Sequence, residues 1–262
     1  MNRIFLTIVI FSLILSSCDN GSDLVNGTPY ESIYQPMSSS PTLLRGATVL
    51  TGNGERFENT DIILKEGKID AIGPNLVAED IIVIDAKGMW VTPGIIDVHS
   101  HLGVYASPRV RAHSDGNEAT APNTAEVWAE HSVWPHDPGF VTALAGGITS
   151  LQILPGSANL IGGRGVTLKN IPGQSVMEMK FPGAPHGLKM ACGENPKRVY
   201  GSRRQPPSTR MGNVAGYRAA WIEASDYRDK IEEANKGQGK PPKRDLKLET
   251  LAGVLNGEIL VH

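Results

Sequence analysis

The stretch Val91-Thr-Pro-Gly-Ile-Ile-Asp-Val-His-Ser-His-Leu-Gly103 guides the interpretation of the whole chain. Residues 95–98 predict a buried strand, because they are dominated by apolar side chains. His99 and His101 follow, and a spacing of two residues places both side chains on one face of a strand. Neutral imidazole is the commonest nitrogen ligand of protein-bound metals. The end of this strand is therefore a candidate metal site.

The residues before this stretch favour a small antiparallel sheet. Residues 43–92 alternate short β-rich runs with turn signals. Glu66-Gly67 lies between two such runs and predicts a tight hairpin in which Gly67 has a positive φ. By itself this pattern indicates a sheet and no particular function.

Residues 43–103 together resemble the opening of the amidohydrolase superfamily, with a β-rich start, Asp85-Ala-Lys-Gly88 and then VTPGIIDVHSHLG. The resemblance implies an α/β fold in which a small β-sandwich, closed by N- and C-terminal segments, adjoins a (β/α)8 TIM-like barrel. It also implies that His99 and His101 bind a divalent metal at the end of barrel strand 1, with Asp97 in support. Active sites of such barrels lie at the carboxyl ends of the strands.

The resemblance continues through further barrel strands. Residues 146–154, 160–169 and 187–198 resemble strands 2, 3 and 4, and residues 258–262 begin a buried strand that fits strand 5. The expected organisation is a signal peptide (1–17), a flexible tether (18–41), a small β-sandwich segment (42–92) and a partial barrel of about strands 1–5 (93–262).

Short sequence motifs and helical patterns add detail on the branch of the superfamily and on the helices. Asn117-Glu118, residues 194–197 and residues 207–211 point to the imidazolonepropionase-like branch of the superfamily. Apolar residues at near-helical spacing predict an amphipathic helix over 217–236 that covers the barrel, and a second helix starts near residue 246.

Three further residues are candidate metal ligands through the resemblance. Lys189 on strand 4 matches the lysine that is carboxylated and bridges two metals in some members; otherwise it is an ordinary lysine. Glu194 competes for that role, because some one-metal members use a glutamate there. His262 is a strand 5 ligand or the neighbour of one. The expected cofactor is zinc or another divalent metal, as one or two ions.

The loop after strand 1, residues 104–140, is long and polar and is expected to shape access to the site. Asn117 and Glu118, together with Asp115, are candidate substrate-binding residues. Other residues of chemically active types are expected to have no direct role at the site. His113, His131 and His136 are expected to be structural or at the surface, and Lys197 and Arg198 to be solvated. Cys192 is expected to be a small buried thiol.

The N-terminus predicts export and a lipid anchor. Arg3 precedes an apolar run over 4–15, which is shorter than the ~20 residues that a spanning helix needs. Leu15-Ser-Ser-Cys18 resembles the lipobox of bacterial lipoproteins, which implies that Cys18 carries the lipid. The expected location is the bacterial cell envelope, with contact to the membrane through this lipid.

Composition excludes some classes. The 262 residues carry a net charge of −2, so no basic field favours nucleic acid. Two cysteines cannot form a disulfide framework. Because the predicted leader and sheet occupy the first 92 residues, about half a barrel remains. We expect a portion of a longer enzyme, inactive alone, with the acid/base aspartate of the family beyond residue 262.

The expected function is metal-dependent hydrolysis of a C–N bond in a small molecule, such as a non-peptide amide, cyclic amide or amidine, by metal-activated water. Two alternatives stay open. One is a prolidase-like metallo-dipeptidase, and the other is a catalytically inactive lipoprotein that only binds a ligand.

Overall fold

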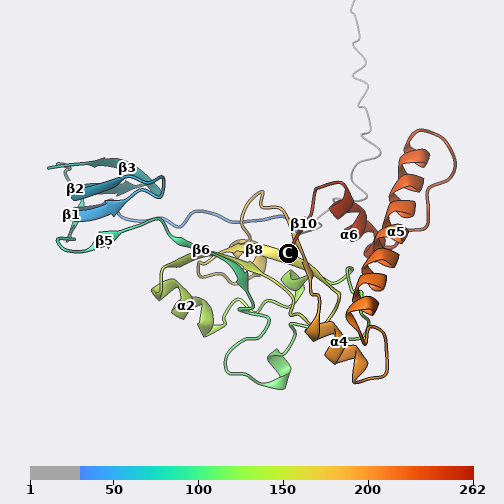
Figure 1. Ribbon diagram of the computed structural model, residues 1–262. Coiled ribbons are helices and arrows are strands. Elements are labelled where there is room, and N and C mark those ends of the chain that lie inside the picture. Colours follow the sequence, from blue (N-terminus) through green and yellow to red (C-terminus); the bar gives the residue numbers. More distant parts are fainter. Residues whose placement is uncertain (1–29) are drawn as a thin grey trace, which may run out of the picture.

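A computed structural model describes residues 30–262 (Figure 1). The predicted signal peptide and Cys18 lie outside the described residues. Within 30–262, no helix combines the length and the apolar character that crossing a membrane requires.

The first sheet lies at one end of the molecule, opposite α5 (Figure 1). Its strand order is β3-β2-β1-β4, with β5 also paired to β1. The predicted hairpin is confirmed, since Lys65 pairs with Lys68 and both Glu66 and Gly67 have positive φ. The strands are β1 (Thr42–Leu50), β2 (Arg56–Lys65), β3 (Lys68–Gly73), β4 (Ile82–Asp85) and β5 (Trp90–Val91).

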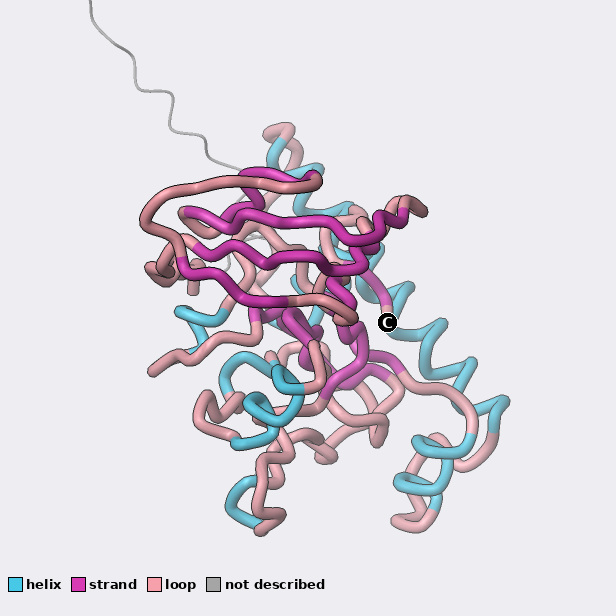
Figure 2. Tube along the Cα trace, turned by 90° about the vertical axis from the view of Figure 1, so that its left-hand side faces the viewer, coloured by secondary structure: helices cyan, strands magenta, loops and turns pink. Residues whose placement is uncertain are grey.

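One side of this sheet is packed and other parts are open. Ala47, Val49, Ile62 and Ala86 form its small core. The apolar side chains of β4, in contrast, remain about half exposed. Figure 2 shows the strands side by side, in a layer that lies beside the rest of the molecule. The described chain thus forms one sheet here, with part of its apolar surface exposed.

The second sheet carries the candidate site. Its order is β10-β9-β8-β7-β6, and it curls into an α/β half-barrel. This confirms the predicted fold class. The strands are β6 (Ile95–Ser100), β7 (Ile148–Ile153), β8 (Ile161–Lys169), β9 (Gly187–Met190) and β10 (Leu260–Val261).

One strand differs from an all-parallel barrel. The segment expected as strand 3 forms β8 at the third position of the sheet, but it runs antiparallel to both β7 and β9. The connection over 154–160 explains the direction, because a parallel crossover needs a dozen or more residues. β6 with β7, and β9 with β10, pair in parallel.

The two outer strands are not buried, contrary to the sequence prediction. Ile95, Ile96 and Val98 of β6 are each more than half exposed, as are Leu260 and Val261 of β10. Both strands lie at the edges of the half-barrel, where no described strand covers them. Apolar sequence indicated burial correctly only for strands with a neighbour on each side.

Helices cover the inner strands of the sheet. Leu151, Ile153 and Leu168 pack with Phe140 of α2 and Met179 of α3. On β8 and β9, a second core joins α5 and α6 to the sheet. The helices are α2 (Pro138–Ala145), α3 (Val176–Met179), α4 (Glu194–Gly201), α5 (Arg210–Asn235) and α6 (Leu246–Leu255), with 3-10 turns η1 (Arg111–His113) and η2 (Ala129–His131).

Both predicted helices are present. α6 begins where the sequence indicated, after Asp245, whose carboxylate accepts the backbone N–H groups of Lys247 and Leu248. α5 starts at Arg210, earlier than predicted, because Thr209 caps its N-terminus through the N–H of Gly212. Its buried residues include Ala220, Ala224, Tyr227 and Ile231, which recur at near-helical spacing.

Part of the segment expected as a flexible tether over 18–41 is described, and its first described residues bond to the half-barrel. Ile33 N–H donates to Met177 O at 3.0 Å, and Ser32 Oγ donates to Lys180 O at 2.6 Å. Lys180 Nζ donates to Tyr30 O at 2.7 Å. These bonds fasten residues 30–33 to the half-barrel, and the chain then runs across to β1 (Figure 1).

Candidate metal centre

The ends of three strands bring four titratable side chains together. His99 lies on β6, Lys189 on β9 and His262 directly after β10. Lys189 Nζ is 3.2 Å from His99 Nε2, and His262 Nε2 is 3.2 Å from His99 Nδ1. The ring centroids of His99 and His101 are 5.2 Å apart. Residues 163 positions apart in the sequence therefore meet in one cluster, which we call the histidine centre.

His101 has a defined tautomer in this arrangement. Its Nδ1 lies 2.8 Å from the backbone oxygen of Leu154, which can only accept a hydrogen bond. Nδ1 therefore carries a proton, and in the neutral ring Nε2 has the lone pair. A backbone carbonyl that orients an imidazole in this way is the usual support of a metal-binding histidine.

The electrostatics of the centre favour neutral ligands. Loss of hydration, followed by the charge of Lys189, lowers the pKa of both His99 and His262. Burial lowers the pKa of Lys189, which is only 4% exposed. Asp97 acts in the opposite direction on the pKa of His99, and its Oδ1 accepts the His99 backbone N–H at 3.1 Å. Neutral imidazoles are the form that a metal requires.

The donor chemistry fits a zinc-type ion, although the described residues do not form a closed metal site. Imidazole nitrogens are ligands that zinc accepts readily. Among residues 30–262, no three His, Cys, Asp or Glu side chains are arranged to hold one ion. The fourth member of the centre is an amine, and the nitrogens of His99 face Lys189 and His262 instead of a common point.

The other predicted residues lie elsewhere. Glu194 forms an exposed ion pair with Arg198 on α4, with Oε1 and Nε 2.7 Å apart. Cys192 is exposed, which corrects the predicted buried thiol, because it lies in the loop between β9 and α4. His131 stacks on Trp128, and His113 lies against Trp134. His136, like Lys197, is exposed.

The predicted substrate-binding residues line a pocket that is separate from the histidine centre. Asp115, Asn117 and Glu118 border a cavity of about 570 Å³ that also touches Trp128 and Pro155. None of the four residues of the histidine centre lines it. The loop after β6 thus forms a pocket of its own beside the strand ends.

Buried polar contacts that the sequence did not predict fix this loop. Asn159 Nδ2 donates to Glu118 O at 2.8 Å and to Thr124 Oγ1 at 2.6 Å. The Tyr200 hydroxyl lies 2.5 Å from Asn159 Oδ1 and 2.6 Å from Ala121 O. We call this set the loop lock. Its members come from three segments that are distant in the sequence, so no local sequence pattern predicts these contacts.

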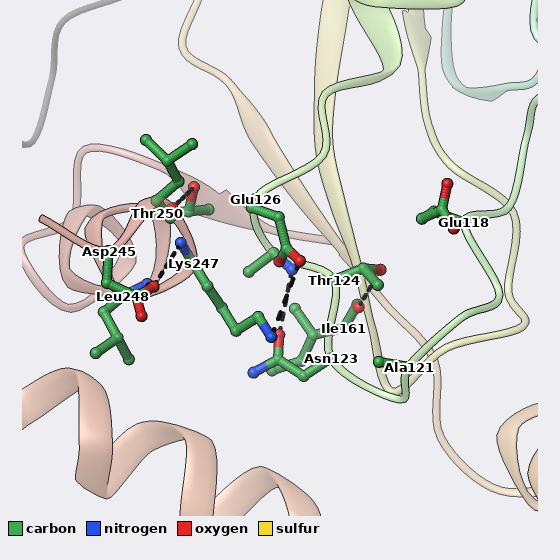
Figure 3. A network of polar contacts seen from close by, with 12 residues as sticks. Glu118, Ala121, Asn123, Thr124, Glu126, Ile161, Asp245, Lys247, Leu248 and Thr250 are labelled. Carbon is green, nitrogen blue, oxygen red and sulfur yellow. Dashed lines mark hydrogen bonds and ion pairs between the residues drawn. The ribbon is translucent and has the colours of Figure 1, made fainter.

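Figure 3 shows the neighbourhood of the loop lock. Thr124 faces Ile161 at the start of β8, and its hydroxyl and N–H both bond Ile161 O. From α6, Lys247 reaches Glu126 with Nζ 3.9 Å from Oε1. The loop is thereby tied both to the sheet and to the covering helix.

The fold and the sequence of this chain are similar to those of known proteins. Amidohydrolase tasK of Hapsidospora irregularis is 33% identical over 264 residues, which is 87% of this chain and 27% of that protein. A solved amidohydrolase from Thermotoga maritima matches with a TM-score of 0.75 and 40% identity, over 82% of this chain and 55% of the other. The chain belongs to the amidohydrolase superfamily.

Other comparisons delimit this assignment. An allantoinase of Rubrobacter xylanophilus is 32% identical over 102 residues, 39% of this chain and 22% of that protein. No protein-family model matches the chain. The chain spans about a quarter of the curated amidohydrolase and about half of the solved one. In this chain the histidine centre lies at the ends of the strands.

Proposed function

We propose that the protein is a metal-dependent hydrolase of C–N bonds in small non-peptide amides, with cyclic amides as its substrate class. The observation that carries the proposal is the convergence of His99, His101, Lys189 and His262 at the strand ends. The relative named allantoinase supports the substrate class, because allantoin is a cyclic amide.

Each residue has a role in this proposal. His101 offers Nε2, since its Nδ1 is bonded to Leu154 O. His99 and His262 supply further imidazole nitrogens. Lys189 contributes its side-chain nitrogen from the buried side of the centre. When bound, a divalent ion would acidify water and polarise the amide carbonyl. The loop over 104–137 would limit access to the centre.

The test uses protein expressed from its complete reading frame. Allantoin, hydantoin and dihydroorotate are assayed with zinc and after chelation, beside the dipeptide Gly-Pro. We expect zinc-dependent hydrolysis of at least one cyclic amide and none of the dipeptide. Faster cleavage of Gly-Pro would favour a dipeptidase. Zinc binding without any turnover would favour a binding protein.

We also propose that Cys18 is lipidated and holds the enzyme at the cell envelope of a bacterium. The support is the Leu15-Ser-Ser-Cys18 word after a short apolar run. In a bacterial host, the unmodified protein should fractionate with membranes and Cys18→Ser should not. Mass spectrometry of the N-terminal peptide would reveal the acyl chains. An unmodified Cys18 in mature protein would contradict the proposal.

A further inference from the structure

Tyr105 stands beside the histidine centre on the loop that follows β6. Its backbone N–H donates to His101 O at 3.1 Å. Its ring packs edge-to-face against the His101 ring, with centroids 5.8 Å apart. The Tyr105 ring is therefore a direct neighbour of the histidine centre.

The hydrogen bonds around Tyr105 define the role of its hydroxyl. The backbone N–H of Ala158 donates to Asn117 Oδ1 at 3.0 Å, which fixes the orientation of this amide. Asn117 Nδ2 then faces the Tyr105 hydroxyl and donates to it. The phenol oxygen is thus an acceptor toward Asn117, and its own hydrogen has no acceptor among residues 30–262.

Two other tyrosines of the region differ in their hydrogen bonds. The Tyr200 hydroxyl faces two oxygen acceptors, Ala121 O and Asn159 Oδ1. The Tyr217 hydroxyl donates to Ala191 O. Both hydroxyls serve the fold. Tyr105 keeps a free donor, and it is the tyrosine that touches a residue of the histidine centre.

Two glycines shape a slot for this phenol. A Cβ on Gly116 would clash with the Tyr105 ring, and a Cβ on Gly156 would lie 2.7 Å from the Tyr105 hydroxyl oxygen. Gly156 N–H donates to Gly116 O at 2.6 Å, which closes the slot. The backbone therefore fixes both the ring and the hydroxyl before any ligand arrives, as functional donors require.

We propose that Tyr105 is a substrate-contacting residue, whose O–H donates a hydrogen bond to the amide oxygen of a substrate at the histidine centre. This rests on the proposed function. Asn117 is then a positioning residue that acts through Tyr105, and not the direct substrate ligand that its place in the sequence suggested. A donor aimed at an oxygen that gains charge during amide hydrolysis favours the reaction.

The experiment compares Tyr105→Phe with Tyr200→Phe in the zinc-loaded protein from the complete reading frame. The substrate is whichever of allantoin, hydantoin and dihydroorotate is hydrolysed fastest. Tyr105→Phe should lower kcat/KM by about 100- to 1,000-fold and weaken the binding of the inert cyclic urea 2-imidazolidinone, measured by calorimetry. Its zinc content and its urea unfolding midpoint should match the unmodified protein.

Tyr200→Phe is the matched control, because it removes a tyrosine hydroxyl from the same region. It should lower the unfolding midpoint and leave kcat/KM within about twofold, since that hydroxyl bonds only the fold. If Tyr105→Phe keeps kcat/KM and 2-imidazolidinone affinity, or loses zinc and stability together with activity, the inference is overturned and the proposed function stands. If the unmodified protein hydrolyses none of the amides, the proposed function fails and the inference with it.

Discussion

The histidine centre and the loop after β6 lie side by side but are built differently. In the centre, His99 and His262 are exposed, and the contacts join titratable groups to each other. In the loop, Asn159 and Tyr200 are buried, and their polar groups bond to backbone and side-chain partners. The centre is exposed and open to exchange with a ligand, whereas the loop is held in place by buried hydrogen bonds. Substitutions should therefore separate the two regions, with stability lost at the buried polar contacts of the loop and zinc lost at the histidine centre.

The largest loss of stability is expected for Lys180→Met. Lys180 Nζ lies 2.7 Å from Glu130 Oε2, and both side chains are buried. Removal of the lysine leaves the Glu130 carboxylate without its cation, which costs about 3–5 kcal/mol. Urea unfolding measures the change. The double variant Lys180→Met with Glu130→Leu should recover much of it, and a double variant as unstable as the single one would contradict this account.

Asn159→Ala should cost somewhat less. It deprives Thr124 and Glu118 of their donor and Tyr200 of an acceptor in a buried setting. We expect a loss of about 1–3 kcal/mol, with zinc content unchanged because the loop lock does not touch the histidine centre. Urea unfolding and metal analysis are run on the same sample. Loss of zinc at full stability would break the separation of the two regions.

Lys189→Met should show the reverse pattern. The amine is buried, and a buried ammonium is costly, so a Met side chain should leave stability unchanged or raise it by about 1 kcal/mol. Zinc per chain should fall, because the side chain beside His99 Nε2 is, when carboxylated, the proposed bridging ligand. A large loss of stability with full zinc content would make Lys189 a structural residue.

The smallest effect is expected at Ile96→Thr. Ile96 is 66% exposed on the edge strand β6, two residues from Val98 and outside the histidine centre. In the described chain its burial contributes little, so urea unfolding should change by no more than about 0.5 kcal/mol. A loss above 2 kcal/mol in the complete protein would show that another segment covers this edge.

The sequence predicted much of what depends on local spacing. His99 lies on β6 and His101 directly follows its end, the Glu66-Gly67 turn forms as expected, and α6 begins after Asp245. The family resemblance also pointed to Lys189 and His262, which the structure brings to His99. These features follow from patterns within a few residues or from motifs that the family shares.

Features that depend on distant contacts could not be predicted. The direction of β8 follows from a short connection, and the exposure of β6 follows from its place at the sheet edge. The bond between Asn117 and Tyr105 needs the Ala158 backbone to orient the amide. An aromatic residue four positions after His101 was the single local signal of this arrangement. Burial of Cys192 was inferred because no paired histidine lies nearby in the sequence, and it was wrong, since the residue lies exposed in a loop.

The most direct test of the account is the zinc content of purified protein from the complete reading frame. Inductively coupled plasma mass spectrometry would compare the unmodified protein with the double variant His99→Asn, His101→Asn, each at confirmed folding by circular dichroism. The account predicts at least one zinc per chain in the unmodified protein and less than about a tenth of that in the folded double variant. Equal zinc in both would show that these strand ends do not hold the metal.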